Sequence, residues 1–277
     1  MAHVLQLSGQ TERVEPYKGF YGQPRIQMPL LVSGKDEQGN VVDVPRTPAS
    51  FGYILDRRMN APKDVREAWQ NNYFFTGDGS TAGAEGDHLI VLDSRHLREI
   101  TAESELYHSA FVLPDGAWDE LKAHKENVLY LTAEEAQQAH GKGYVKKSGV
   151  WVPANRTVAK VWDILSGGRD LISYIQLVSE NSPNRESLLN VYLNQTTTKD
   201  GKPTMRSWVA LRVDLDSDAV GYNSLDDRYG RLVGVAPEAH VGRALEARVQ
   251  SALQQGTEFE FNGRLYVPVD ASTRLTR

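Results

Sequence analysis

An alternation of apolar and polar residues within 188–218 constrains the fold of this chain most strongly. Successive side chains of a β-strand point to opposite faces, so a period of two separates a buried face from an exposed one. In the second half of this segment, one parity is mostly apolar and comprises Met205, Val209, Leu211, Val213 and Leu215. The other parity comprises Arg206, Trp208, Arg212, Asp214 and Asp216. The pattern predicts a strand with one face in the core and one face available for chemistry.

A turn inside the same segment predicts a long hairpin around residues 188–216. The tripeptide Asp-Gly-Lys at 200–202 suits a three-residue loop whose glycine adopts a positive φ. A two-residue Asp-Gly turn is the alternative, but it sets Leu193 against Trp208. Because a one-residue slip exchanges the two faces of a strand, the three-residue loop is preferred. It pairs Val191 with Leu211 and Leu193 with Val209.

The polar face of this predicted hairpin is the candidate binding surface. Planar guanidinium groups match carboxylate or phosphate oxygens, and exposed aromatic rings offer faces for stacking. The alternative is a solvated or helix-covered face on which Arg212 simply pairs with neighbouring aspartates. The binding interpretation predicts recognition of a protein partner or of an anionic small ligand. Its candidate ligand-binding residues are Tyr192, Asn194, Arg206, Trp208 and Arg212.

The densest group of carboxylates follows the predicted hairpin, at Asp214, Asp216 and Asp218. Carboxylate oxygens are ligands for hard divalent cations such as magnesium or manganese, and such ions support hydrolysis and phosphoryl transfer. The alternative is a solvated strand end that runs into an acidic turn. A second, weaker metal hypothesis uses Asp93 and His96, for which a short helix capped after the strand is the alternative.

The glycine-rich segment 76–87 is expected to be a flexible loop, and it leads into a buried strand at 88–92. A phosphate-binding loop is rejected, because these glycines precede a strand and include no lysine. The chain also lacks a Gly-x-Ser-x-Gly nucleophile elbow. A hairpin around 34–40 is expected after an irregular N-terminal arm at 1–24. Helices are predicted at 62–71, 115–124, 132–140, 157–164, 169–179 and 236–255.

Composition narrows the class of protein more than its activity. The chain has 277 residues, a net charge of −5 and no cysteine, which excludes disulfides and thiolate chemistry. There is no overall basic character, so a nucleic-acid contact would have to be local. No apolar run approaches the roughly 20 residues of a membrane span, and the N-terminus has no basic segment followed by an apolar run. Cytoplasmic localisation and no membrane partner are therefore the expectations.

Together these observations predict an α+β fold, with an antiparallel sheet built on the 188–216 hairpin and helices packed on one side. Residues 1–277 are expected to form one domain, with a loose boundary near 125–130 as the alternative. The resemblance of 141–153 to 256–268, each after an alanine- and glutamine-rich helix, leaves an internal duplication open.

Three functional hypotheses follow. The first is a non-catalytic binding or assembly protein that uses the Arg/Trp/Asn face. The second is a divalent-metal-dependent hydrolase or nuclease that uses the Asp cluster. The third is a structural subunit of a larger assembly, in which the Pro/Gly-rich arm and the aromatic residues at 16–24 contact a neighbouring subunit.

Overall fold

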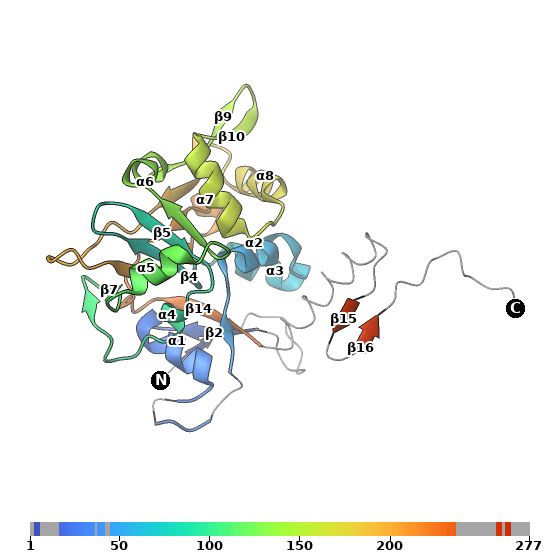
Figure 1. Ribbon diagram of the computed structural model, residues 1–277. Helices are drawn as coiled ribbons and strands as arrows, with labels where there is room; N and C mark the ends of the chain where they lie inside the picture. The colour runs from blue at the N-terminus through green and yellow to red at the C-terminus, as the bar shows by residue number, and fades with distance from the viewer. Residues whose placement is uncertain are drawn as a thin grey trace, which may run out of the picture.

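The computed structural model describes residues 3–5, 17–36, 38–41, 45–236, 259–261 and 264–266. Eight α-helices and one short 3-10 helix lie in these residues (Figure 1). The helices are α1 (Pro24–Ser33), α2 (Phe51–Asn60), α3 (Lys63–Gln70), α4 (Arg95–Arg98), α5 (Ala117–Ala123), α6 (Ala133–Ala139), α7 (Arg156–Ser166), α8 (Leu171–Asn181) and the 3-10 helix η1 (Val213–Leu215).

The strands form one 14-stranded mixed sheet and one separate hairpin. The sheet contains β1 (His3–Leu5), β2 (Tyr17–Tyr21), β3 (Thr47–Pro48), β4 (Phe74–Ala82), β5 (His88–Val91), β6 (Leu106–Tyr107), β7 (Ala110–Val112), β8 (Val128–Leu131), β9 (Lys142–Lys147), β10 (Val150–Pro153), β11 (Ser187–Tyr192), β12 (Thr204–Ala210), β13 (Ala219–Val220) and β14 (Arg231–Val235). The hairpin pairs β15 (Phe259–Phe261) with β16 (Arg264–Tyr266). The predicted α+β class is confirmed.

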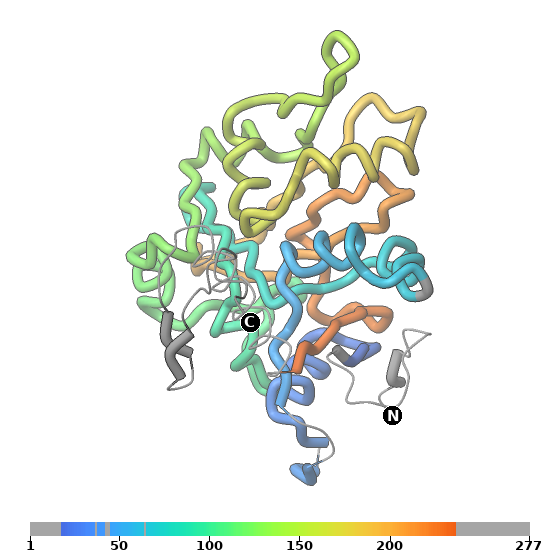
Figure 2. Tube along the Cα trace, turned by 90° about the vertical axis from the view of Figure 1, so that its right-hand side faces the viewer, coloured from blue at the N-terminus to red at the C-terminus, as the bar shows by residue number. Residues whose placement is uncertain are grey.

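The main path of the sheet runs β1-β2-β14-β4-β12-β13-β11-β9-β10. From β4 a branch leads through β5 to β8, and β7 pairs with the first two residues of β12. Most of these pairs are antiparallel, whereas β11 with β13 and β14 with β4 are parallel. The tube in Figure 2 shows the hairpin of β9 and β10 projecting beyond the rest of the described chain, as it also does in Figure 1.

Helices cover both faces of the sheet, not one face as the sequence suggested. Trp208 and Ala210 of β12 belong to a core cluster with side chains of α2, α3, α6, α7 and α8. Met205 and Val209 of the same strand belong to a second cluster, which includes side chains of α1, α4 and α5. Because β12 is covered on both faces, its period of two does not separate core from solvent.

The predicted hairpin is wrong in its pairing. The chain does turn at 200–202, where Gly201 has φ 81° and donates its N–H to the carbonyl of Thr198 at 3.0 Å. However, β13 lies between β11 and β12, so Val191 faces Ala219 and Val209 faces Val220. After Ala210 the strand ends, and the 3-10 helix η1 replaces the predicted continuation to 216. The strand β13, which comes later in the chain, therefore pairs with both strands that the sequence pattern had paired with each other.

The glycine-rich segment 76–87 is mostly strand and not a flexible loop. All nine residues of β4 are buried. A Cβ atom on Gly79 would lie 2.8 Å from the sulfur of Met205, and one on Gly77 would lie 3.1 Å from Cβ of Pro48. The glycines therefore allow neighbouring elements to approach closely, which is the usual reason for glycine inside a strand.

Two expectations for the N-terminal region are confirmed only in part. An antiparallel bridge between Lys35 and Val41 closes the predicted turn at 34–40, but the residues before this turn are helical and not a strand. They form α1, which begins at Pro24, ends at Ser33 and is followed by Gly34 with φ 66°. Proline at the first turn and glycine just past the end are regular helix boundaries. The arm at 1–24 is not irregular throughout, because β2 pairs with β14. Most of the predicted helix at 236–255 lies outside the described residues.

Helix predictions elsewhere are confirmed by α3, α5, α6, α7 and α8, and the strand prediction at 88–92 is confirmed by β5. At the start of α6, Thr132 accepts the N–H of Glu135 and Glu135 accepts the N–H of Thr132, each at 3.2 Å. This capping box was visible in the sequence because both residues lie within one turn.

Candidate functional site

The five predicted ligand-binding residues do not form one exposed surface. Trp208 is fully buried and donates its indole N–H to the carbonyl of Gly79 at 3.0 Å. Asn194 is also buried, and its Nδ2 donates to the carbonyl and hydroxyl oxygens of Thr204 at 3.0 and 3.1 Å. These groups are satisfied inside the protein, so the recognition surface proposed from strand parity is wrong at its centre.

The two arginines of that set are separated as well. Arg206 is buried and donates to the carbonyls of Asn223 and His108, and burial lowers the pKa of its guanidinium. Arg212 lies at the surface in a bidentate ion pair with Asp214. Arg206 therefore fastens two loops to β12, whereas Arg212 is neutralised locally.

The aspartate cluster does not converge on a cation site. Asp214 pairs with Arg212, and Asp216 pairs with Arg185 at 2.9 Å. Asp218 accepts the backbone N–H and the side-chain amide of Asn190 at 2.7 and 3.0 Å, and burial raises the pKa of its carboxyl to about 6. Across the described part of the chain, no three His, Asp or Glu side chains are placed to hold a metal ion.

A groove of about 560 Å³ lies where β4, β5, α6 and the segment after β11 meet. We call it the Asp87 groove. Six of its lining residues are small: Ala82, Gly83, Ala84, Gly86, Ala133 and Ala136. Polar side chains surround these small residues: Asp87, His88, Gln137, His140, Asn194, Gln195 and Thr197. Because three separate segments (82–88, 133–140 and 193–197) supply the lining, no local sequence motif marks this groove.

The floor of the groove is a saturated polar network. His88 is 1% exposed, and its Nε2 lies 3.1 Å from the hydroxyl of Ser80. The same hydroxyl accepts the backbone N–H of Asn194 at 3.0 Å. Burial is the main cause that lowers the pKa of His88 to about 3, so its imidazole is neutral at physiological pH. These groups hold the floor in place but have little capacity left for a ligand.

His140 brings a directed donor to the rim. Its Nδ1 accepts the backbone N–H of Leu193 at 3.2 Å, and burial lowers its pKa. A neutral imidazole whose Nδ1 is an acceptor carries its proton on Nε2. The ring packs edge-to-face on Tyr192, with centroids 5.9 Å apart, and Tyr192 packs in the same way on Tyr222. Tyr192 thus supports the rim of the groove, although the sequence placed it on another surface.

Among the described residues that line the groove, Asp87 alone is formally charged. Its carboxylate makes no hydrogen bond or ion pair with any described residue. It folds over the turn before β5: a Cβ atom on Gly83 would lie 2.1 Å from Oδ1 of Asp87 and 2.6 Å from the indole of Trp118. The glycine therefore leaves room for a carboxylate next to an aromatic ring. Of the residues that line this groove, the sequence analysis had named Asn194 as a binding residue, whereas it missed the roles of Asp87, Gln137 and His140.

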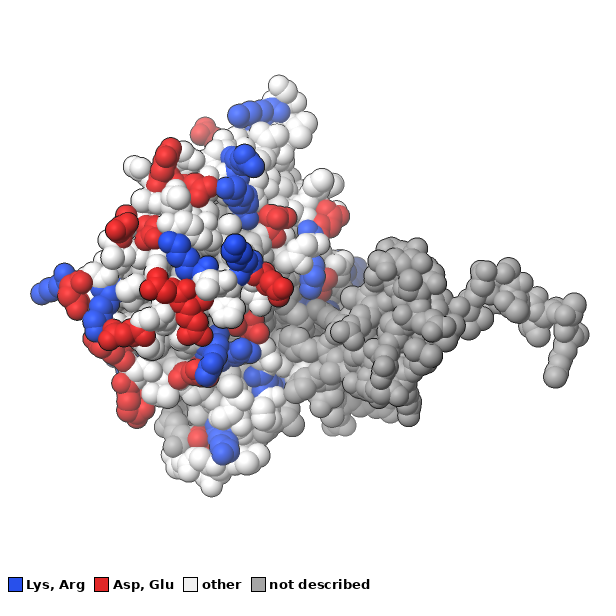
Figure 3. All heavy atoms as spheres, viewed as in Figure 1, with Lys and Arg blue, Asp and Glu red and all other residues white. Residues whose placement is uncertain are grey.

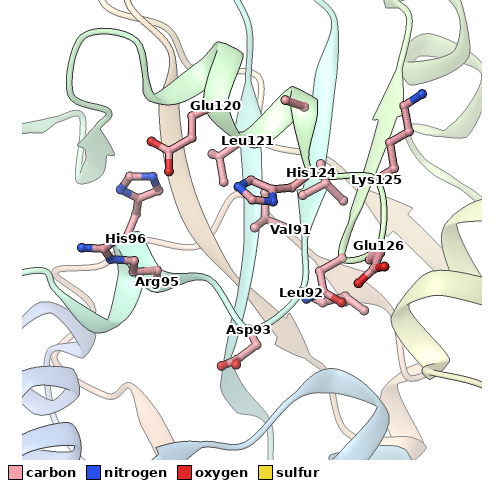
Figure 4. Close-up of a pocket in the computed structure, with 13 residues that line it drawn as sticks. Val91, Leu92, Asp93, Arg95, His96, Glu120, Leu121, His124, Lys125 and Glu126 are labelled. Atoms are coloured by element: carbon pink, nitrogen blue, oxygen red, sulfur yellow. The ribbon is translucent and has the colours of Figure 1, made fainter.

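A second pocket, of about 440 Å³, lies between α4, α5 and the start of β8 (Figure 4). Its floor is apolar, with Val91, Leu121 and Val128. Charged side chains of both signs surround this floor. Two of them are neutralised by ion pairs: Asp93 pairs with Arg98 at 3.2 Å, and Arg95 pairs with Glu99 at 2.7 Å. The predicted helix cap after Asp93 is present, because Ser94 accepts the N–H of Leu97. Neither sign of charge predominates in this pocket, so its lining does not favour one class of ligand.

Comparison with known proteins gives one informative match. No family model and no curated protein matches the chain. A solved structure, described as "Accommodation of massive sequence variation in Nanoarchaeota by the C-type lectin fold", matches with a TM-score of 0.54 and 14% sequence identity. The match covers 82% of this chain and 100% of the other. No helix in the described part of this chain is long and apolar enough to cross a bilayer. At this identity the likeness shows the fold alone, and the chain is similar in fold to this C-type lectin-fold protein.

Proposed function

We propose that this chain is a non-catalytic binding protein whose Asp87 groove accepts an ammonium-bearing group, such as a lysine side chain of a protein partner. The observation that carries this proposal is the unpaired carboxylate of Asp87 in a groove lined by no cation. A partly buried charge without a counter-charge favours a ligand that supplies one. A C-type lectin fold, as a binding-type fold, is compatible with this role.

The electrostatics of the groove favour a cation over the anionic ligand suggested by the sequence. Both histidines of the lining have lowered pKa values and are neutral at pH 7. Neither of them offers a positive charge to a phosphate or carboxylate. Glu85, two residues before Asp87, is exposed and adds a second negative charge nearby.

The shape and polarity of the walls fit a lysine side chain. Lysine buries its methylene stem along apolar surface while its ammonium group needs three hydrogen-bond acceptors. Alanine and glycine line the walls, and acceptor oxygens are available on Asp87, Gln137 and Thr197. A bulkier or branched ligand would gain less from walls made of such small residues.

The serine–histidine contact of the groove supports a role in binding and not in catalysis. A nucleophile must be reached by its substrate, but Ser80 is fully buried and lies behind His88. Its hydroxyl is already engaged by the N–H of Asn194. The pair therefore acts as packing for the floor.

The test is a titration with Nα-acetyl-lysine methylamide, followed by NMR chemical shifts or calorimetry, with the norleucine analogue as the neutral control. We expect saturable binding of the lysine compound alone. Asp87→Asn keeps the size of the side chain and removes its charge, so it should weaken binding about tenfold, which corresponds to about 1.4 kcal/mol. Glu85→Gln is the matched control and should change affinity by less than about twofold. Equal binding of both compounds, or an unchanged affinity in Asp87→Asn, would reject the proposal.

A further inference from the structure

The hairpin of β9 and β10 carries a local excess of positive charge in an acidic protein. Residues 141–159 contain Lys142, Lys146, Lys147 and Arg156 but no aspartate or glutamate, whereas the whole chain has a net charge of −5. Figure 3 shows Lys and Arg side chains gathered at the top of the molecule, where this hairpin projects. We call residues 142–153 the basic arm.

The tip of the basic arm is exposed and has no acidic partner. Lys147 pairs across the strands with Val150, which is 63% exposed, and Lys146 pairs with Trp151. Lys146 lies 5.9 Å from the ring of Trp151, and none of the three lysines of the arm forms an ion pair with a described residue. The tip therefore offers two unneutralised ammonium groups beside an apolar side chain.

The arm is a stiff projection. Its two-residue turn has positive φ at Ser148 (50°) and Gly149 (85°), the conformation of a tight hairpin turn whose twist matches its strands. Its base is fixed in the sheet, because Tyr144 is buried and pairs with Leu188 of β11. A hairpin held in this way points away from the body and cannot fold back onto the groove of its own chain.

The arm and the Asp87 groove are complementary and adjacent in the chain. The groove has an unpaired carboxylate and no cation, and the arm has lysines and no carboxylate. His140 lines the groove, and β9 begins two residues later. The basic arm and the Asp87 groove therefore lie next to each other. In a dimer with a two-fold axis, the arm of each copy contacts the groove of the other, so both contacts form together.

We propose that a second copy of this chain occupies the Asp87 groove, with lysine side chains of its basic arm directed at Asp87, in a reciprocal dimer. This inference rests on the proposed function of the groove and names its partner. The contact brings opposite charges together at a small interface. It is therefore expected to weaken as salt screens them.

The experiment measures mass against protein concentration by analytical ultracentrifugation, at low and at high salt. We expect a dimer at low salt and dissociation as salt rises. Lys146→Glu with Lys147→Glu should be monomeric, and so should Asp87→Lys, because each variant places like charges at both contacts. An equimolar mixture of these two variants should dimerise again, since both contacts then join opposite charges. Thermal melts of the exposed-site variants confirm that each is folded.

A matched control separates a specific contact from general charge effects. Lys63→Glu with Arg228→Glu makes the same change in net charge at exposed positions outside the arm, and should leave the dimer intact. A monomer at every concentration, a dimer that survives either variant, or no recovery in the mixture would overturn the inference. Loss of the dimer in the control would overturn it too. If the lysine compound still binds a monomeric protein, the proposed function stands and only the identity of the partner fails.

Discussion

Two polar regions of this molecule differ in whether their groups are already satisfied. Around Arg58, which is fully buried, the guanidinium donates to the carbonyls of Trp69, Asn72 and Ala210 and to two hydroxyl groups. In the Asp87 groove, neither the carboxylate of Asp87 nor the Nε2–H of His140 has a partner among the residues that the structure describes. The first region ties α2, α3, α8 and β12 together, whereas the second has bonding capacity left for a ligand. The difference indicates that unpaired polar groups at a surface, and not polar residues as such, mark the site.

Removal of the Arg58 side-chain charge is expected to have the largest effect on stability. Arg58→Met leaves several buried carbonyls without a donor, so we expect a loss of about 3–5 kcal/mol in the free energy of unfolding. Chemical denaturation measures this loss. Affinity for the lysine compound should remain unchanged while the protein is folded. Arg169→Met, which loses one exposed hydrogen bond to Gly167, should stay within about 0.5 kcal/mol.

The pH dependence of stability tests a second satisfied group, Asp218. Its folded pKa of about 6 exceeds the ordinary aspartate value of 3.8, so the folded protein binds more protons than the unfolded chain between these values. Its contribution to stability is therefore greatest below pH 4 and falls, by at most about 3 kcal/mol, as the pH rises through 6. Asp218→Asn should flatten this part of the stability curve, as measured by denaturation from pH 4 to 7. Asp115→Asn, at an exposed site, should leave the slope unchanged.

Part of the pH dependence of stability should persist in Asp218→Asn, because the pKa of Asp78 is raised in the same direction. Asp78 is fully buried and accepts the N–H groups of Phe51 and Asp93 at 2.6 and 2.8 Å, and burial raises its pKa to about 6. A slope that is identical in the variant and in the parent protein would contradict the assignment to Asp218.

Trp208 tests whether a side chain that the sequence analysis placed on the binding surface contributes to stability or to binding. Trp208→Phe removes the donor to the carbonyl of Gly79 and leaves a space, so we expect a loss of about 2 kcal/mol in the free energy of unfolding. Binding of the lysine compound should not change. Weaker binding with unaltered stability would restore the earlier interpretation and contradict the buried position.

Gly83→Ala is expected to have the smallest effect on stability and a clear effect on the groove. The new methyl group meets the far ends of the side chains of Asp87 and Trp118, which can move aside at a cost of about 1 kcal/mol. The displaced carboxylate should weaken lysine binding several-fold in the same titration. Ala84→Ser, at an exposed position of the same turn, is the matched control. Unchanged affinity in Gly83→Ala would mean that the carboxylate position is not important.

Local signals in the sequence predicted much of the secondary structure correctly. The capping box of Thr132 and Glu135 acts within one turn, and β5 is a short apolar run bounded by polar residues. The glycines of β4 were misleading, because their cause is the close approach of Met205 and Pro48 from distant parts of the chain. The groove could not be predicted for a similar reason, since the three segments that line it are separated by tens of residues.

The α+β class, most helix boundaries and the turn at 200–202 could be predicted from the sequence, because these features depend on neighbouring residues. Which polar side chains lack a hydrogen-bond partner depends on the tertiary structure. Trp208 and Asp87 both carry polar groups. Trp208 finds an acceptor inside the sheet, whereas Asp87, at the groove, has no partner among the described residues. Burial depends on every layer that packs on a strand, and a period of two cannot report whether one face or both are covered.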